Sequence, residues 1–566
     1  MNDIIKPNNW ADILLQTLQS HGGVDTIFWY PGGASIPLYN SFAHSDIRHI
    51  LARHEQWAAF MAQWYNRSTW RLWVVDATSW PGVANTFTAI ADAYKDNIAI
   101  LLISWQVTSS MIGRDAFQEL DTQSAFWNIT KYFTQIRNVK DIISETMKAI
   151  DMALSGRPGP VHIDIPKDIF LTPYISKTIS TSYVYEKPQL DILQIYKCID
   201  MLEKATRPVL LIWHWVKLSW AEENLRNLVE RLWIPTVETA LAKGVLAPDS
   251  SHSLGMLGMH WFYQANMAIS EADLILNIGS RFDDRIVGNY DDFWKAAKII
   301  HVDVDKRELW KIVDIDMWIH ADADKFISAL QKVYAWDMLD IKTWRETIKA
   351  WKKEKPYMID SWTFGGKQVL KKISNIAKNL PKDVIYAVDV GQHQMWASQI
   401  LEIENSQNRL FSGWFGTMWF SLPSSIWAAV ANPEKKVICI SGDGGVQMNI
   451  QELGVLVQKQ ANTLKDLDIK IIILDNEYLG MVKQWQDLFP ENTRSNVDVL
   501  SPDFDMLWKA YGIPSYQLDT IDAMDKELWN ILSSDGPSLI WCKIAKEENV
   551  FPMVPAGKRL DQMVFE

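Results

Sequence analysis

A glycine-rich turn that follows a buried strand constrains this chain more than any other feature. The apolar run at 436–440 (KVICI) predicts a strand buried on both faces, and it leads into Gly442-Asp443-Gly444. A second apolar run at 470–474 (KIIIL) leads into Asp475-Asn476. Buried strands of this kind are typical of a parallel sheet, whose carboxyl ends meet at one edge. We therefore expect the two polar ends to lie close together.

The residue types in these turns favour a magnesium-diphosphate site. Glycine lets the backbone approach a diphosphate closely. The carboxylate of Asp443 and the amide oxygen of Asn476 are hard ligands of the kind that Mg²⁺ takes together with phosphate oxygens. From these residues alone, an ordinary strand-turn-helix connection in an α/β domain remains an open alternative.

Length and composition indicate a large globular protein that acts on small molecules. At 566 residues the chain exceeds the size of a single core, and its net charge of −12 comes with no basic stripe that would favour nucleic acid or an anionic membrane. Cys198, Cys439 and Cys542 lack metal-type spacing, and no apolar run approaches the ~20 residues that span a bilayer. The first fifteen residues also lack the pattern of a secretory leader. We expect a cytoplasmic protein whose partners include neither membrane nor nucleic acid.

Alternating strand and helix patterns predict an α/β fold with three doubly wound domains in series. The expected domains are 1–175, 190–335 and 368–566, with a linker at 169–188 and a connecting helix at about 337–367. A dinucleotide site and a structural role suit the middle domain equally well. The main helices are expected at 55–67 and 82–95, and the strands at 71–75, 98–104, 161–165, 208–212, 272–278, 298–304, 384–388, 436–440, 470–474 and 538–542.

Eight segments, in chain order, resemble the catalytic large subunit of acetohydroxyacid synthase (acetolactate synthase), a family of thiamine-diphosphate enzymes. One Gly-Asp-Gly turn is a weak sign, whereas eight ordered matches across nearly the whole chain are a strong one. The resemblance implies pyrimidine binding by the first domain, an FAD-associated second domain, and diphosphate and Mg²⁺ binding by the third. The segments are Tyr30-Pro31-Gly32-Gly33, Arg53-His54-Glu55-Gln56, Asp115-Ala116-Phe117-Gln118-Glu119, Gly156-Arg157-Pro158-Gly159-Pro160, Gly255-Met256-Leu257-Gly258-Met259-His260, Arg281-Phe282-Asp283-Asp284-Arg285, Asp389-Val390-Gly391-Gln392-His393-Gln394-Met395-Trp396 and Gly442-Asp443-Gly444.

The resemblance gives two residues a part in activating thiamine diphosphate. Glu55 would bond to N1′ of the aminopyrimidine and favour its imino tautomer, and proton positioning of this kind contributes roughly 10²–10⁴ in rate. Met418 would lie beneath the cofactor and hold it bent. Without the family, Glu55 would be read as a solvated helical side chain and Met418 as core filling.

The same resemblance places the diphosphate and its metal in the third domain. Gln392 and His393 would meet the diphosphate, although a histidine here could equally be structural. Asp443, Asn476 and the backbone of Tyr478 would bind Mg²⁺. Further positions that the family pattern assigns to the cofactor are Pro31, Gly32, Asn85, Gly391, Gly416, Gly442, Gly444, Gly445, Leu479, Gly480 and Met481.

The family's reaction decarboxylates pyruvate and joins the two-carbon unit to a second pyruvate or to 2-oxobutyrate, in the biosynthesis of valine, leucine and isoleucine. Arg285 would bind the carboxylate of the second substrate, a task that suits a planar guanidinium. From the residues alone, an ion pair with Asp283 or Asp284 is equally open. Trp485 matches the position associated with preference for 2-oxobutyrate. Other matches to the active-site wall, which would otherwise be read as core or surface, are Phe117, Gln118, Met259 and Lys167.

The resemblance also implies FAD, a multi-chain assembly and a regulatory partner. Arg157, His260, Arg281 and Asp303 lie in segments that resemble the FAD-binding elements of the biosynthetic branch, where FAD takes no net redox part. The expected assembly is a homodimer or homotetramer whose active sites combine the first domain of one chain with the third domain of another, and a small regulatory subunit is expected. Another thiamine-diphosphate carboligase or decarboxylase is the alternative enzyme, and a non-catalytic paralogue is the alternative outside catalysis.

Two differences from the family concern the metal turns. Asp443 and Asn476 are separated by 33 positions, about six more than is typical, and extra loop length of this kind, expected at 460–468, costs little entropy. Asp475 replaces the first residue of the usual Asn-Asn pair. The ligand position, Asn476, is intact.

A third difference is the presence of tryptophan at seventeen positions where the family has glycine. Glycine makes up about 4.6% of the chain, against a usual ~7%, and Trp (29) outnumbers Gly (26). Glycine is used where φ is positive or where the backbone approaches a neighbour closely, and tryptophan meets neither need. Seventeen changes that each cost of order one kcal/mol would exceed the ~5–15 kcal/mol stability of a domain. The positions are 10, 29, 57, 64, 70, 73, 80, 105, 127, 213, 215, 233, 261, 310, 414, 419 and 427.

One hypothesis explains this pattern. Some bacterial lineages read the codon UGA as glycine, and a translation that reads UGA as tryptophan would convert a subset of glycines and nothing else. Restoring all seventeen brings glycine to about 7.6% of the chain, the ordinary level. Trp396 and Trp485, where the family also has tryptophan, would then be genuine. A deliberately tryptophan-rich sequence is the alternative, and it predicts no such division.

Overall fold

The computed structural model describes residues 9–565 except 70–71, 171, 173–184, 291–296, 335–338, 361, 458–466 and 489–493. For residues 64–69 it describes the backbone but not the side chains. Most of the predicted linker, residues 460–466 of the predicted longer loop, Trp70 and the side chain of Trp64 therefore lie outside what is described. No helix of the described residues is both long and apolar enough to cross a membrane.

The first sheet is parallel, and its strands run in the order β2-β1-β3-β4-β6-β5. Its strands are β1 (Thr26–Tyr30), β2 (Arg48–Leu51), β3 (Trp73–Ala77), β4 (Ile100–Gln106), β5 (Tyr132–Gln135) and β6 (Val161–Pro166). Its helices are α1 (Trp10–Ser20), α2 (Ile36–Phe42), α3 (Glu55–Thr69), α4 (Pro81–Asn85), α5 (Phe87–Asp96), α6 (Thr122–Phe126), α7 (Ile142–Leu154) and α8 (Lys167–Phe170).

The second sheet is also parallel, in the order β12-β11-β10-β7-β8-β9. Its strands are β7 (Pro208–Ile212), β8 (Thr236–Glu238), β9 (Ser253–Met256), β10 (Leu274–Ile278), β11 (Lys298–Asp303) and β12 (Met317–His320). Its helices are α9 (Ile192–Lys204), α10 (His214–Leu218), α11 (Glu222–Leu232), α12 (Tyr263–Glu271), α13 (Asp284–Val287) and α14 (Ala323–Val333), and α15 (Lys342–Glu354) follows.

The third sheet has the order β14-β13-β15-β16-β18-β17. Its strands are β13 (Val384–Val388), β14 (Arg409–Leu410), β15 (Lys436–Gly442), β16 (Ile469–Asp475), β17 (Ser515–Leu518) and β18 (Ser538–Lys543). Its helices are α16 (Gly366–Ala377), α17 (Gln392–Ile400), α18 (Ser421–Ala431), α19 (Asp443–Gln447), α20 (Leu453–Leu456), α21 (Gly480–Asp487), α22 (Phe504–Ala510) and α23 (Ile521–Ser533). Three parallel sheets, each accompanied by helices, confirm the predicted fold class of three α/β domains in series.

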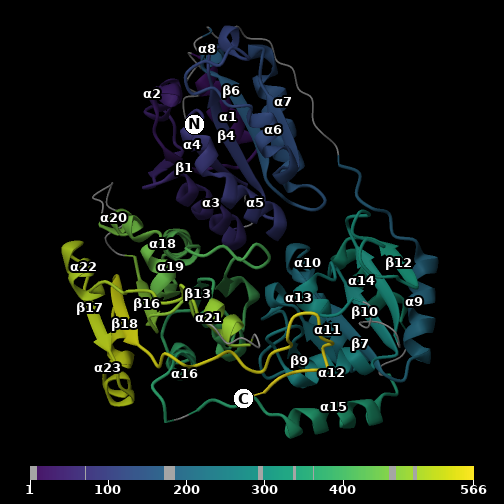
Figure 1. Cartoon of the computed structure of the whole chain (residues 1–566). Helices are drawn as coiled ribbons and strands as arrows, with labels where there is room; N and C mark the ends of the chain where they lie inside the picture. The colour runs from purple at the N-terminus through teal and green to yellow at the C-terminus, as the bar shows by residue number, and fades with distance from the viewer. Residues whose placement is uncertain are drawn as a thin grey trace. The chain divides into compact units, whose positions relative to one another are not determined.

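The chain forms two compact units. The first contains residues 1–185, 379–393 and 410–544, and thus both the first sheet and the third, drawn in Figure 1 in purple to blue and in green to yellow. One core joins these two sheets, because α3 packs on α18. The second unit contains residues 186–378, 394–409 and 545–566 and has its own core around the second sheet.

Continuous apolar runs predicted the strands well, because a strand that is buried on both faces has no polar alternation. All seven residues of β15 and all seven of β16 are buried. The helix predicted at 82–95 is instead two helices, and the Thr86 hydroxyl between them hydrogen-bonds the Val83 carbonyl, which competes with helix continuation. The connecting helix predicted at about 337–367 is shorter, since α15 ends at Glu354, just before Lys355 and Pro356.

Several tryptophans have a backbone or an environment that suits glycine better. Trp233 (φ 59°), Trp310 (φ 65°) and Trp419 (φ 64°) are left-handed, a conformation that costs a residue with a Cβ roughly 1–2 kcal/mol. Trp233 is the C-cap of α11, where glycine is the usual residue. The buried indole N–H groups of Trp57 and Trp427 have no hydrogen-bond partner among the described residues. These local conflicts are the kind that the glycine hypothesis anticipates.

Candidate active site

The turn between β15 and α19 is built for close approach of backbone. Asp443, the first residue of α19, is buried. A Cβ at Gly445 would lie 2.6 Å from Oδ2 of Asp389, a distance at which the turn or the Asp389 side chain would have to shift. Burial raises the pKa of Asp389 to about 6, although its carboxylate accepts hydrogen bonds from Val390 N and Ser441 Oγ.

The second polar turn lies beside the first. β15 and β16 are parallel neighbours that pair Gly442 with Leu474, which confirms that the two strand ends share one sheet edge. Oδ1 of Asn476 accepts a hydrogen bond from Tyr478 N at 3.2 Å, and its Nδ2 donates to Oε1 of Gln392 at 3.3 Å. The structure thus brings together Asn476 and Gln392, two of the predicted cofactor residues.

A pair of carboxylates dominates the electrostatics of this edge. Ser501 Oγ lies 3.4 Å from Oδ2 of Asp443 and 2.9 Å from Oδ1 of Asp475. Burial, and then the charge of Asp475, raises the pKa of Asp443 to about 8. Asp475 is held by Trp541, whose Nε1 donates to Oδ2 at 2.8 Å. A bound cation would relieve the repulsion between the two carboxylates.

The donor set fits Mg²⁺ that shares its ligands with a diphosphate. Across the described residues, no group of three or more His, Cys, Asp and Glu side chains could hold a metal ion. One carboxylate (Asp443), one amide oxygen (Asn476) and a backbone carbonyl leave ligand positions that phosphate oxygens and water fill in sites of this type.

His393 offers a buried polar atom beside the same turn. Its Nε2 is buried and has no hydrogen-bond partner among the described residues, and burial lowers the pKa of the ring to about 4, so that the imidazole is neutral. A Cβ at Gly442 would lie 3.1 Å from the ring. An unsatisfied polar atom at the glycine turn fits a polar ligand at this edge of the sheet.

The loop with Met418 lies next to the Gly-Asp-Gly turn. The Met418 Cε atom is 3.9 Å from the place that a Cβ would take at Gly444. This loop contains two of the seventeen tryptophans, Trp414 and Trp419. Trp419 has a φ of 64°, and the Trp414 ring lies under the ammonium group of Lys95, 4.3 Å from its centroid.

A second group of predicted residues gathers at the carboxyl ends of β1, β2 and β3. Glu55 begins α3 and is 7% exposed, so the alternative of a solvated glutamate is wrong. Its Oε2 accepts a hydrogen bond from Asn85 Nδ2 at 3.0 Å. A Cβ at Gly82 would lie 3.1 Å from Glu55 Oε1, and one at Gly32 would lie 2.2 Å from the Thr78 hydroxyl. Gly82 thus lies directly against one buried, hydrogen-bonded carboxylate.

Comparisons with known proteins agree with both clusters. Three thiamine pyrophosphate enzyme models match: the N-terminal TPP binding domain at residues 8–125, the central domain at 195–330, and the C-terminal TPP binding domain at 389–542. The acetolactate synthase large subunit of Lactococcus lactis is 39% identical over 99% of this chain and 96% of its own length. The isozyme 2 large subunit of Escherichia coli is 36% identical over 98% and 99%, and the large subunit of Cyanidium caldarium is 37% identical over 100% and 97%.

The chain belongs to the acetolactate synthase large-subunit family. Its two clusters coincide with the two TPP-binding models, because Glu55 lies in the N-terminal match and Asp443 and Asn476 lie in the C-terminal match. The described residues of this family member therefore fit both ends of thiamine diphosphate.

The substrate positions expected of an acetolactate synthase are only partly assembled. Arg285 Nη1 donates to the Met259 sulfur at 3.4 Å, which joins two of the predicted residues. The same guanidinium forms an exposed ion pair with Asp284 (3.6 Å), the alternative that the residues alone left open. Phe117 is 89% exposed, and Gln118 Oε1 accepts a hydrogen bond from Ser79 Oγ. Lys167 is exposed and Trp485 is half-buried in α21.

The FAD elements expected of the biosynthetic branch do not fit FAD as the sequence is written. Indoles occupy the β7–α10 turn, the type of strand-helix turn on which dinucleotides place their diphosphate. The position of a Cβ at Gly279 is only 2.5 Å from the Trp215 Cβ, and the Arg281 guanidinium lies 4.6 Å from the centroid of the Trp213 ring. The other predicted residues remain in place: His260 and Asp303 are buried, and Arg157, in the first unit, donates to Asn97.

Sequence reasoning missed three polar residues of this family member's site. Thr78 directly follows β3, so the rule that strand ends gather at one edge could have found it. Gln484 accepts a hydrogen bond from Gln392 Nε2 at 3.1 Å and lies one helical turn beyond Gly480, on α21. Ser501 lies in an irregular segment with no pattern that marks it.

Proposed function

We propose that this chain is the catalytic subunit of an acetolactate synthase. It would decarboxylate pyruvate and join the two-carbon unit to a second pyruvate or to 2-oxobutyrate, in branched-chain amino acid biosynthesis. The observation that carries the proposal is the buried Asp443 beside Asn476 at adjacent ends of β15 and β16, in a chain that matches the large subunits from end to end.

Thiamine diphosphate, when bound, supplies the nucleophilic carbon and the electron sink for decarboxylation. Glu55 would hold the proton at the pyrimidine end, and the hydrogen bond from Asn85 fixes the orientation of its carboxylate. Met418 would support the cofactor from the loop beside Gly444. Pro31, Gly32 and Gly416 would contribute backbone to its walls.

Mg²⁺ and the diphosphate would be held at the other end by residues of the third sheet. Asp443, the Asn476 amide oxygen and the Tyr478 carbonyl would bind the metal. Gln392 and His393 would face the phosphate oxygens, with Gly391, Gly442, Gly444 and Gly445 leaving room for them. The start of α21 at Leu479, Gly480 and Met481 would direct backbone N–H groups toward the anion.

Arg285 would bind the carboxylate of the second 2-oxo acid by exchanging its exposed partner Asp284 for the substrate. An exposed ion pair is worth little, so the exchange costs little. Met259, which contacts Arg285, would form part of the apolar wall. Phe117, Gln118, Lys167 and Trp485 are proposed as the remaining substrate-facing residues.

The proposed enzyme is a cytoplasmic homodimer or homotetramer with a separate regulatory subunit. The names of its relatives, which are large subunits, support a small partner. We propose FAD as a cofactor only for a chain with glycine at 213 and 215, because Trp213 and Trp215 fill the turn that would bind it. No catalytic step in the proposal depends on FAD. Sedimentation of the purified chain would measure the assembly, and an active monomer would contradict it.

The proposal is tested by product analysis with pyruvate alone and with added 2-oxobutyrate, in the presence of thiamine diphosphate and Mg²⁺. Acetolactate from the first mixture and acetohydroxybutyrate from the second are expected. Glu55→Gln should lower the rate at least about a hundredfold, the low end of the range for general acid-base catalysis. Asp522→Asn, which removes an exposed carboxylate on α23, is the matched control and should leave the rate unchanged. Acetaldehyde alone would instead indicate a decarboxylase.

A further inference from the structure

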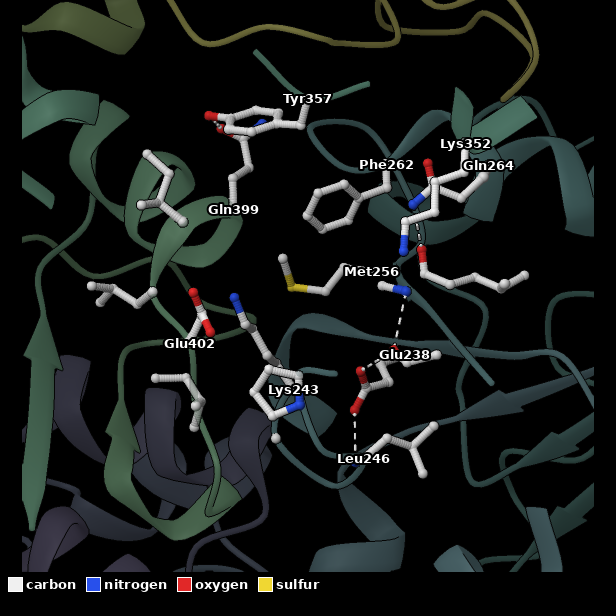
Figure 2. Close-up of a pocket in the computed structure, with 18 of the residues that line it drawn as sticks. Glu238, Lys243, Leu246, Met256, Phe262, Gln264, Lys352, Tyr357, Gln399 and Glu402 are labelled. Atoms are coloured by element: carbon white, nitrogen blue, oxygen red, sulfur yellow. Dashed lines mark hydrogen bonds between the residues drawn. The ribbon is translucent and has the colours of Figure 1, made fainter. Parts of the chain in front are cut away.

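A cavity in the second unit lies apart from the residues that the proposed function uses. Its volume is about 290 Å³, and it is bounded by the β8–β9 region, the end of α15 and the end of α17 (Figure 2). All of its lining residues belong to one compact unit, and none of them is a tryptophan.

One wall of the cavity is apolar and well fixed. Met256 and Phe262 point into the space from β9 and the start of α12 (Figure 2), and Leu246 also lines it. Gly255 has a φ of 81°, and a Cβ there would lie 2.5 Å from the Phe262 ring. A left-handed glycine thus seats the Phe262 ring against the cavity.

The two carboxylates of the lining are already satisfied by protein groups. Glu238 is buried and accepts hydrogen bonds from Leu246 N and Ser253 Oγ, both at 3.2 Å. Glu402 pairs with Lys371 at 3.3 Å and with Lys378 at 2.5 Å. Neither carboxylate needs a cationic ligand.

The lysines of the lining are in the opposite situation. Lys352, on α15, and Lys355, just beyond its end, are both exposed, and neither forms an ion pair with a carboxylate of the described residues. The Lys355 ammonium lies 5.0 Å from the centroid of the Phe565 ring. Lys243 donates to the Ser398 carbonyl, and its amine points into the cavity (Figure 2). The cavity thus combines an apolar wall with two exposed ammonium groups, those of Lys352 and Lys355, that no carboxylate of the described residues pairs.

We propose that this cavity binds a small amphipathic monocarboxylate, with the apolar body against Met256 and Phe262 and the carboxylate at Lys352 and Lys355. The volume of about 290 Å³ lies just below the ~300–1,000 Å³ that is typical of ligand pockets, which favours a short aliphatic acid over a larger ligand such as a nucleotide. The proposal does not depend on the catalytic function.

Titration calorimetry of the full chain with hexanoate tests the proposal, with 1-hexanol as the uncharged probe of similar shape. Hexanoate should bind about tenfold more tightly than hexanol, the factor expected from one favourable charge interaction. The double variant Lys352→Gln/Lys355→Gln should reduce hexanoate affinity to that of hexanol. Lys353→Gln, which removes an exposed lysine of α15 that does not line the cavity, is the matched control and should bind hexanoate like the unmodified chain.

Thermal unfolding of each variant establishes that it is folded, and both lysine positions are exposed, so folding should be unaffected. Equal affinity for hexanoate and hexanol would overturn the proposal. So would equal hexanoate affinity in the double variant and the control, or the absence of measurable binding at millimolar hexanoate.

Discussion

Two turns of this molecule each connect a buried parallel strand to a helix, but one contains glycines and the other contains tryptophans. In the β15–α19 turn, Gly445 leaves room beside Asp389, because a Cβ at this position would lie 2.6 Å from a carboxylate oxygen of Asp389. The buried Asp443 is the first residue of the helix. In the β7–α10 turn, Trp213 and Trp215 stand on either side of His214, and Trp215 is forced against Gly279.

The difference shows which of the two turns has space for a diphosphate when the tryptophans are present. Both turns follow a fully buried parallel strand, so the sheet presents both to ligands in the same way. Only the turn that keeps its glycines leaves space for a diphosphate. The turn with indoles leaves no such space. A different conflict, a left-handed backbone at a residue with a Cβ, occurs at Trp233, Trp310 and Trp419. That the encoded residues there are glycine stays a prediction, and the following experiments would break or sharpen it.

The largest expected effect is the recovery of FAD binding. The double variant Trp213→Gly/Trp215→Gly should change the chain from one that retains no flavin to one that binds it stoichiometrically, because the indoles no longer fill the turn. Flavin fluorescence after gel filtration measures this.

Trp220→Gly is the matched control, since it replaces an exposed tryptophan shortly after the same helix and leaves the turn filled. A double variant that stays flavin-free would show that the indoles are not what excludes FAD.

Removal of the metal should have the next largest effect, and only at the turn with glycines. Mg²⁺ with thiamine diphosphate at a hundred times its Kd should stabilise the chain by about 2.7 kcal/mol, and a chelator should reverse this. Asp443→Asn should abolish the gain, since it removes the one carboxylate ligand of the proposed site. Thermal unfolding with and without ligands measures both, and a persistent gain in this variant would place the cofactor elsewhere.

A methyl group at the intact turn should be destabilising even without ligand. Gly445→Ala should lower the free energy of unfolding by roughly 1–3 kcal/mol, the usual cost of overpacking, because its Cβ meets Asp389. At Gly33, where a Cβ meets open space, the same substitution should cost far less. Denaturant unfolding of both variants makes the comparison, and equal costs would mean that the turn is looser than described.

The smallest expected effect is a gain in stability at one exposed tryptophan. Trp310 is 55% exposed with a φ of 65°, so Trp310→Gly should relieve about 1 kcal/mol of backbone strain and lose little burial. Trp318→Gly, at an exposed position in the extended strand β12, should instead destabilise the chain. Destabilisation by both substitutions would argue that tryptophan is native at 310.

Much of the fold could be predicted from the sequence, because its strands are buried on both faces and read as continuous apolar runs. The strands at 208–212 and 384–388 have the predicted bounds. The division of the helix predicted at 82–95 could not be foreseen, since it depends on the Thr86 side chain.

Prediction of the site was limited by contacts between distant segments. The closeness of Asp443 and Asn476 followed from strand order alone. The burial of Glu55 required knowledge of what covers it, and Ser501 reaches the site from an irregular segment. The state of Arg285 depends on competition between Asp284 and a substrate, which no sequence pattern decides.

Peptide mass spectrometry of the protein purified from its native source tests the central comparison most directly. The peptides that span 213–215 and 414–419 should carry glycine at 213, 215, 414 and 419, whereas Trp396 and Trp485 should be tryptophan. With this result, both strand-helix turns would contain glycines that leave space for a diphosphate. Tryptophan at all six positions would contradict it and would make the filled β7–α10 turn a real property of the enzyme.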